Sequence, residues 1–199
     1  MFEGIDGVGK TTQLQLVQET LEKTGWPVLA TRNMGGTPIG EALRDVLMSP
    51  LERPPLTDFY ASLAIQEPLL DIIDTACKEG KIVLMDRGPL SLAAYQIYGR
   101  GIEETIGWQH VNASMDRLKP EAVIFYDMDP GMALERNQKH PEKASYFESK
   151  SLQYFHEVAR GFRAATERYS SITVTIDASQ PVEAVQKQTM AAISKLLAA

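Results

Sequence analysis

The feature that most constrains how this chain folds lies at its start, where residues 4–11 read GIDGVGKT. This stretch satisfies the pattern G-x-x-x-x-G-K-[ST], whose glycine-rich backbone curls round a polyphosphate and points successive N–H groups at its oxygens. Such a loop connects a strand to a helix, and Leu14, Val17 and Leu21 follow at helical spacing. The motif therefore predicts a helix N-terminus that faces an anion. A plain glycine turn between strand and helix is the alternative.

The residues of this loop predict a site for ATP and Mg²⁺. Lys10 is expected to neutralise the outer phosphates, and the hydroxyl of Thr11 is expected to ligate Mg²⁺. The nucleotide would lie against the backbone of the loop and of the first helical turn. The residues predicted to bind it are Gly4, Gly7, Val8, Gly9, Lys10, Thr11 and Thr12.

Short apolar runs alternate with longer helical patterns along the rest of the chain. Four of these runs, at 26–30, 81–85, 122–126 and 172–176, read as strands. The alternation is typical of βαβ units, so we predict an α/β fold in which helices cover both faces of a parallel sheet, a three-layer αβα arrangement. At 199 residues, with no internal repeat or linker, residues 1–199 are expected to form a single domain.

The first strand is short in this sequence, because only Met1, Phe2 and Glu3 precede the loop. A strand usually has five or six residues. We favour the interpretation that further apolar residues precede Met1, and the alternative is a short central strand.

Charge and cysteine content exclude several classes of protein. The chain carries 20 Lys and Arg against 26 Asp and Glu, a formal net charge of −6, so it has no overall attraction for nucleic acid or anionic lipid. Cys77 is its one cysteine, which excludes an intrachain disulfide. No apolar run approaches the roughly 20 residues that span a bilayer. We expect a cytoplasmic protein that binds neither nucleic acid nor membrane.

A second polar motif, Asp86-Arg87, follows the apolar run 81–85. Ligands of open α/β sheets bind at the carboxyl ends of the strands, where these two side chains are expected to lie. Asp86 could hold Mg²⁺, and the Arg87 guanidinium is suited to bidentate capture of a phosphate. A surface ion pair is the alternative. The base-reading sequence N-K-x-D of a GTPase does not occur.

Together these residues resemble the bacterial thymidylate kinases in order and spacing, over nearly the whole chain. The resemblance implies a P-loop kinase fold, an ATP–Mg²⁺ donor, a mobile lid and a homodimer. The segments that carry it are 2–13 (FEGIDGVGKTTQ), 31–38 (TRNMGGTP), Asp86-Arg87 with Ser91, 94–96 (AYQ) and 99–102 (GRGI).

The resemblance also implies roles at the acceptor site. Asp6 would contact the 3′-hydroxyl of the sugar and Arg87 would hold the acceptor phosphate. Phe59 would stack on the base, although an aromatic residue on a predicted helix 57–78 is otherwise expected in the core. Tyr95 would pack beneath the deoxyribose. The predicted substrate-binding residues are Asp6, Arg32, Phe59, Arg87, Ser91, Tyr95 and Gln96.

This chain departs from the family pattern where the base is read. Asn33 and Met34 stand where the family has glutamate and proline. Leu63 replaces the arginine that reads a base carbonyl, and Leu92 replaces a polar residue that often contacts the base. Buried polar groups of the base would then lack partners, so we expect reduced discrimination for thymine.

The predicted lid lies at about 137–147. By the resemblance it supplies catalytic cations, here Arg136 at its start and Lys139 within it. Lysine lacks the bidentate fork of arginine, so phosphoryl transfer is expected to be slower than in relatives with arginines in the lid.

The expected reaction is transfer of the γ-phosphoryl group of ATP to a deoxynucleoside monophosphate, with dTMP as the expected acceptor. A phosphate acceptor is mostly dianionic at pH 7, so no strong general base is needed. Catalysis would come from Lys10, Asp6, Arg87 and the lid cations. Two alternatives stay open. One is a kinase for another or modified pyrimidine nucleotide or nucleoside, with Glu3 or Asp6 as base, and the other is a nucleotide-binding protein without catalysis.

Overall fold

The computed structural model describes residues 1–138 and 151–198. Short strands alternate with helices along the chain. The strands are β1 (Phe2–Glu3), β2 (Val28–Arg32), β3 (Ile82–Asp86), β4 (Val123–Asp127) and β5 (Thr173–Asp177). The α-helices are α1 (Lys10–Lys23), α2 (Pro38–Met48), α3 (Pro55–Lys78), α4 (Pro89–Leu92), α5 (Glu104–Leu118), α6 (Pro130–Gln138), α7 (Leu152–Arg168) and α8 (Val182–Leu197). A π-helical segment, η1 (Ala93–Tyr98), continues α4, and a 3₁₀ turn, η4 (Ser170–Ile172), precedes β5.

The five strands form one parallel sheet in the order β2-β3-β1-β4-β5. The two-residue β1 is central, with Phe2 opposite Asp86 on one side and Ile124 on the other. The loop after β1 therefore leaves the middle of the sheet at its carboxyl edge. The predicted α/β class is confirmed.

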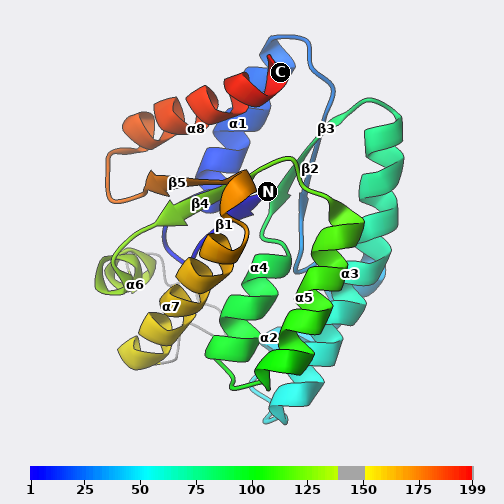
Figure 1. Cartoon of the computed structure of the whole chain (residues 1–199), viewed down its shortest axis with the longest axis vertical. Coiled ribbons are helices and arrows are strands. Elements are labelled where there is room, and N and C mark those ends of the chain that lie inside the picture. The colour runs from blue at the N-terminus through cyan, green and yellow to red at the C-terminus, as the bar shows by residue number, and fades with distance from the viewer. Residues whose placement is uncertain (139–150, 199) are drawn as a thin grey trace.

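Helices cover both faces of this sheet. On one face Tyr126 stacks on Phe2, with ring centroids 5.9 Å apart, and its hydroxyl lies 3.0 Å from that of Thr189 on α8. On the other face Phe125 stacks on Phe162 of α7 at 6.1 Å. Figure 1 shows α1 and α8 on one side of the sheet and α3, α5 and α7 on the other. The three-layer αβα prediction is thus correct.

The strand boundaries lie one or two residues later than predicted. The expected runs 26–30, 81–85, 122–126 and 172–176 are observed at 28–32, 82–86, 123–127 and 173–177. The reason is that the ladder continues through polar residues at the carboxyl edge, where Arg32 pairs with Asp86 and Asp127 with Asp177. Backbone pairing does not require an apolar side chain at the end of a strand.

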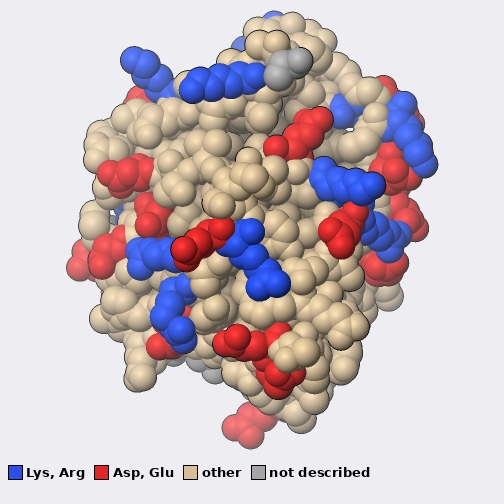
Figure 2. All heavy atoms as spheres, viewed as in Figure 1, with Lys and Arg blue, Asp and Glu red and all other residues tan. Residues whose placement is uncertain are grey.

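The surface carries mixed charge. Figure 2 shows lysine and arginine side chains interspersed with aspartate and glutamate over the face in view. Within residues 1–138 and 151–198 no helix has the length and apolar character needed to cross a membrane.

Candidate active site

The phosphate loop adopts a conformation that its glycines permit. Gly7 has φ +86°, and a Cβ atom there would overlap the carbonyl oxygen of Ala133 on α6. Gly9 has φ 89° and precedes the first residue of α1. Both positions lie in the left-handed region, which favours glycine. The loop therefore brings the N-terminus of α1, the positive end of that helix, to the carboxyl edge of the sheet. Val8 packs its side chain into the core, whereas Thr12 is exposed on the first turn of α1.

Lys10 lies folded into this loop. Its Nζ donates a hydrogen bond to the carbonyl oxygen of Ile5 at 2.7 Å, and the side chain is buried. Burial, together with repulsion from Arg87, lowers the pKa of Lys10 to about 8, although Asp6 and nearby carboxylates act in the opposite direction. Phosphate oxygens at the mouth of the loop would add negative charge beside the ammonium group and raise that pKa again.

The two predicted metal-binding residues lie side by side. The Thr11 hydroxyl donates to Oδ2 of Asp86 at 2.7 Å, across from α1 to the end of β3. Residues 1–138 and 151–198 hold no cluster of three or more His, Cys, Asp or Glu side chains arranged for a metal. Mg²⁺ does not need one, because it is usually bound by one or two protein oxygens together with substrate phosphates and water. This hydroxyl–carboxylate pair fits Mg²⁺ delivered with a nucleotide.

Arg87 makes several polar contacts beside the loop. It has φ 66°, uncommon for a residue other than glycine, and its backbone N–H donates to the carbonyl oxygen of Phe2 at 2.9 Å. Its guanidinium donates to the carbonyl oxygen of Gly4 at 3.0 Å and to the Ser91 hydroxyl at 3.2 Å. It also forms an ion pair with Asp6. The strained backbone thus turns this guanidinium toward the phosphate loop.

Asp6 and Tyr95 complete this cluster. The Tyr95 hydroxyl donates to Asp6 at 2.9 Å, and the Arg87 guanidinium lies 5.0 Å from the centre of the Tyr95 ring. Burial alone would raise the pKa of Asp6, but the charges of Arg87 and Lys10 lower it below its ordinary value. Burial likewise disfavours the charged form of Arg87, but the negative charge of Asp6 raises the pKa of Arg87 above its ordinary value. Both groups are therefore ionised over the physiological pH range.

Glu3 holds the segment that follows Arg87 through hydrogen bonds. The carboxylate is fully buried at the end of β1 and accepts hydrogen bonds from the backbone N–H groups of Gly88 at 2.9 Å and Ser91 at 3.1 Å. The Ser91 hydroxyl donates to its other oxygen at 2.6 Å. Burial raises the pKa of Glu3 to about 7, although the hydrogen bonds from Ser91 and the charge of Arg87 lower it. Glu3 therefore ties the start of α4 to the centre of the sheet.

A cavity of about 120 Å³ opens beside the Asp6–Arg87–Tyr95 cluster. Its walls come from the segment after β2, from α2, from α3, and from α4 with η1. The remaining lining residues are Asn33, Met34, Arg44, Met48, Ser62, Gln66, Ser91, Leu92 and Gln96. The π-helical η1 contributes Tyr95 and Gln96, and π-helical turns often occur at functional sites.

Three buried amides in this cavity have an atom with no hydrogen-bond partner among the described residues: Nε2 of Gln66, Oε1 of Gln96 and Oδ1 of Asn33. The orientation of two is set by a neighbour. Gln66 Oε1 accepts from the Ser114 hydroxyl at 3.5 Å, which leaves its N–H₂ group without a partner. Asn33 Nδ2 donates to the Gly88 carbonyl oxygen at 3.3 Å. A buried polar atom without a partner is costly, so these atoms are suited to a polar ligand.

Five of the seven predicted substrate-binding residues line this cavity: Asp6, Arg87, Ser91, Tyr95 and Gln96. Arg32 does not line it, because its guanidinium pairs with Glu41 at 2.5 Å near the surface. The structure contradicts the stacking role predicted for Phe59. That ring is fully buried in a core cluster with Leu90 and Leu92 and does not line the cavity, which on α3 is lined by Ser62 and Gln66.

Of the predicted lid and its cations, only the first residues lie within the part of the chain that the structure describes. The Arg136 guanidinium donates to the carbonyl oxygens of Ala178 at 3.0 Å and Ser179 at 3.2 Å, so it lies at the loop after β5. The predicted lid extends from 137 to 147, and only its first two residues are described. Lys139 lies outside the described residues.

Sequence reasoning missed several cavity residues. Arg44 reaches the cavity from α2 and donates to the carbonyl oxygen of Met34 at 3.2 Å. Ser62 and Gln66 are four residues apart and therefore share one face of α3. That polar i, i+4 pair, which flanks the apolar residues Leu63 and Ile65 on α3, was a signal available in the sequence. No such signal marked Arg44, because it is one of several charged residues on α2 and nothing in the sequence sets it apart from the others.

Comparison with known proteins adds an independent finding. The family model for thymidylate kinase matches residues 2–189. The chain is 37% identical to the thymidylate kinase of Geobacillus sp. (strain WCH70), over 96% of this chain and 93% of that protein. It is 35% identical to that of Pelotomaculum thermopropionicum, over 99% and 93%. It is 34% identical to that of Shewanella amazonensis, over 99% and 96%.

Proposed function

The chain belongs to the thymidylate kinase family, and from this membership we propose that it transfers the γ-phosphoryl group of ATP to dTMP, giving ADP and dTDP. The single observation that carries the site assignment is the cluster of Lys10, Asp6 and Arg87 between the phosphate loop and the cavity. It would lie between a donor phosphate in the loop and an acceptor phosphate in the cavity. An oxygen of the acceptor phosphate then attacks the γ-phosphorus while the bond to the β-phosphate oxygen breaks.

The donor half of the site rests on the loop and two side chains. The backbone N–H groups of the loop and of the α1 N-terminus would hold the ATP phosphates, with Lys10 at the outer ones. Thr11 and Asp86 would hold Mg²⁺. Bound there, the ion would neutralise charge on the transferred phosphoryl group.

The acceptor half rests on two arginines. Arg87 and Arg44 both line the cavity and can neutralise a dianionic phosphate. Asp6 and Tyr95 lie beside them, where a carboxylate and a hydroxyl can hydrogen-bond a sugar hydroxyl. No group in this account removes a proton, because the acceptor phosphate is mostly ionised at pH 7.

The base would meet the unpaired amides. Gln66 Nε2 can donate to a base carbonyl, and Gln96 Oε1 can accept from the N–H of a pyrimidine imide. The expectation of weak thymine discrimination rested on Leu63 and Leu92. Leu63 packs beside a core cluster and does not line the cavity, whereas Leu92 does line it. Gln66 supplies the polar contact that Leu63 lacks, so we infer that dTMP is read through hydrogen bonds.

The test is an ADP-release assay with a panel of nucleosides and nucleoside monophosphates. Wild-type chain is expected to prefer dTMP among the monophosphates and to ignore thymidine. Lys10→Ala should abolish turnover, whereas Lys23→Ala on the same helix, with a side chain 76% exposed, should not. Turnover by Lys10→Ala at the wild-type rate, or a preference for an unphosphorylated nucleoside, would refute the assignment.

We also propose a homodimer and a cytoplasmic location. Several large apolar side chains on α2 and α3 are exposed, which favours a protein partner on that side. They are Ile39, Val46, Leu56, Tyr60 and Ile72. Light scattering after gel filtration should give twice the chain mass of 22.1 kDa. The location follows from substrates that are intracellular, and fractionation of cells that express the chain would test it. The lid role of Arg136 and Lys139 stays a prediction.

A further inference from the structure

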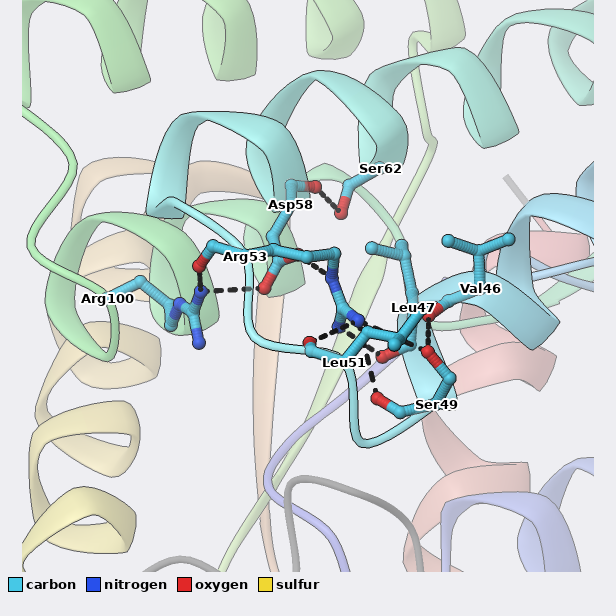
Figure 3. A network of polar contacts seen from close by, with 8 residues as sticks. All are labelled: Val46, Leu47, Ser49, Leu51, Arg53, Asp58, Ser62 and Arg100. Carbon is cyan, nitrogen blue, oxygen red and sulfur yellow. Dashed lines mark hydrogen bonds and ion pairs between the residues drawn. The ribbon is translucent and has the colours of Figure 1, made fainter.

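A buried ion cluster joins three elements that contribute residues to the wall of the acceptor cavity. The Asp58 side chain, 1% exposed, lies on the first turn of α3 between two arginines. Arg53 Nε donates to one carboxylate oxygen at 2.7 Å, and Arg100 pairs with the other at 2.8 Å. Figure 3 shows the carboxylate held between the two guanidinium groups. The arginine side chains are only 9% and 14% exposed, so solvent screens these pairs little.

Arg53 also closes the end of α2. Its guanidinium donates to the carbonyl oxygens of Leu47 at 2.9 Å, Leu51 at 2.7 Å and Ser49 at 3.3 Å. Carbonyl groups at a helix C-terminus lack intrahelical partners and carry partial negative charge, so a cation is favourable there. A carboxylate on the first turn of α3 is favourable for the opposite reason. The cluster therefore joins the C-terminus of α2 to the N-terminus of α3 at a fixed spacing.

Arg100 connects this joint to a third element. It follows η1 by two residues, and its guanidinium also donates to the Arg53 carbonyl oxygen at 3.2 Å. Each element at the joint contributes to the cavity: α2 contributes Arg44 and Met48, and η1 contributes Tyr95 and Gln96. On α3 the joint and the cavity are one helical turn apart. The Ser62 hydroxyl, one turn after Asp58, donates to the Asp58 carbonyl oxygen at 2.7 Å, and Ser62 lines the cavity.

We propose that Asp58 is a positioning residue that sets the spacing of the α2, α3 and η1 walls of the acceptor cavity through Arg53 and Arg100. Neither Asp58 nor its two arginines lines the cavity, so they act through the residues that do. The phosphate loop and the Thr11–Asp86 pair belong to other elements. The cluster therefore controls acceptor binding and leaves donor binding alone. This inference rests on the proposed function, since it assigns the cavity to the acceptor.

The test is calorimetric titration with dTMP alone and, separately, with ADP alone. Asp58→Asn keeps the shape of the side chain and removes its charge. We expect the Kd for dTMP to rise at least tenfold while the Kd for ADP stays within twofold of wild type. Arg100→Gln leaves the Asp58–Arg53 pair and should raise the Kd for dTMP by a smaller factor, again without changing that for ADP. If Asp58→Asn is unfolded by circular dichroism, Arg100→Gln alone decides.

The matched control is Arg117→Gln. Arg117 also ties a second helix to α3, through Asp71 at 2.8 Å, but that pair is exposed and neither residue lines the cavity. Its loss should leave both affinities unchanged. Equal affinities for dTMP in wild type and in the folded cluster variants, or a parallel loss of dTMP and ADP binding, would overturn the inference and leave the proposed function intact. A wild-type chain that does not bind dTMP would refute the proposed function, and the inference with it.

Discussion

Replacing Glu3 by glutamine should change how stability depends on pH. Glu3 is buried at the end of β1, and burial raises its pKa from 4.5 to about 7. Between these values the native chain keeps a proton that the unfolded chain has lost. The free energy of unfolding of wild type therefore falls as pH rises from 4.5 to 7 through this group, and levels off above 7. Glutamine does not titrate and lacks this contribution.

The size of the effect follows from the pKa. Each pKa unit corresponds to about 1.4 kcal/mol, so a rise from 4.5 to about 7 corresponds to roughly 3 kcal/mol. Glutamine can keep the two backbone contacts, because its Oε1 can accept from Gly88 and Ser91 as the carboxylate does. Its amide must donate to the Ser91 hydroxyl, which then accepts where it now donates. The variant is therefore expected to fold.

The measurement is urea unfolding of wild type and Glu3→Gln at pH values from 4 to 8. The unfolding free energy of the variant minus that of wild type should increase by roughly 3 kcal/mol across the range. Titrating groups that do not interact with Glu3 are common to both proteins and cancel in the difference, whereas the Met1 amino group and Lys10 lose the charge of Glu3 as a neighbour in the variant. Glu167→Gln, at an exposed position on α7, should show a nearly constant difference. A flat difference for Glu3→Gln would show that the buried carboxyl does not titrate as described.

Two variants test the acceptor cavity. Gln66→Met keeps the length of this cavity-lining side chain but removes its unpaired N–H₂ group, so a buried base carbonyl would lose the donor proposed for it. The value of kcat/KM for dTMP should fall by a factor of about 5 to 150, equivalent to about 1–3 kcal/mol, while exposed Gln188→Met should not change it. Arg44→Met should raise the KM for dTMP at least about tenfold with little change in the KM for ATP, because Arg44 lines the cavity and not the loop. An unchanged KM for dTMP would remove Arg44 from the acceptor site.

The parts of the site that the sequence predicts well are those fixed by local backbone chemistry. Gly7 and Gly9 need left-handed backbone, and Lys10 and Thr11 follow them at a set distance, so the loop's shape is specified within eight residues. Asp86-Arg87 was equally predictable, because the end of a parallel strand must lie at the carboxyl edge of the sheet. The Thr11–Asp86 contact combines two such local predictions.

The orientation of α3 could not be predicted in the same way. The family resemblance suggested Phe59 as the residue facing the base, although apolar aromatic residues favour the core. In the structure that ring is fully buried, as the favourable free energy of burying an aromatic side chain leads one to expect. Phe59 packs against Leu90 in the core, and the polar Ser62 and Gln66 face the cavity. Resemblance in sequence therefore pointed to α3, which does line the cavity, but to a side chain of α3 that lies in the core.

The residues from 33 to 48 reach the cavity for reasons that lie outside their own sequence. Asn33 is held by the Gly88 carbonyl oxygen, 55 residues away, and Arg44 is placed by the packing of α2 on α3. That packing depends on the Asp58 cluster, whose partners Arg53 and Arg100 are 47 residues apart. Periodicity carries no information about such contacts, since they form only when the helices assemble.

The site also combines features that disfavour folding when each is taken alone. Glu3 and Lys10 are ionisable side chains with almost no solvent exposure, and Arg87 has a positive φ. Arg87 lowers the pKa of Lys10, and Arg32 does the same for Arg44 after burial, so the cations around the site repel one another. Phosphate groups of ATP and dTMP would relieve that repulsion, because each places negative charge among them. Binding of these ligands is therefore expected to stabilise the folded protein. The stabilisation requires phosphate groups both at the loop and in the cavity.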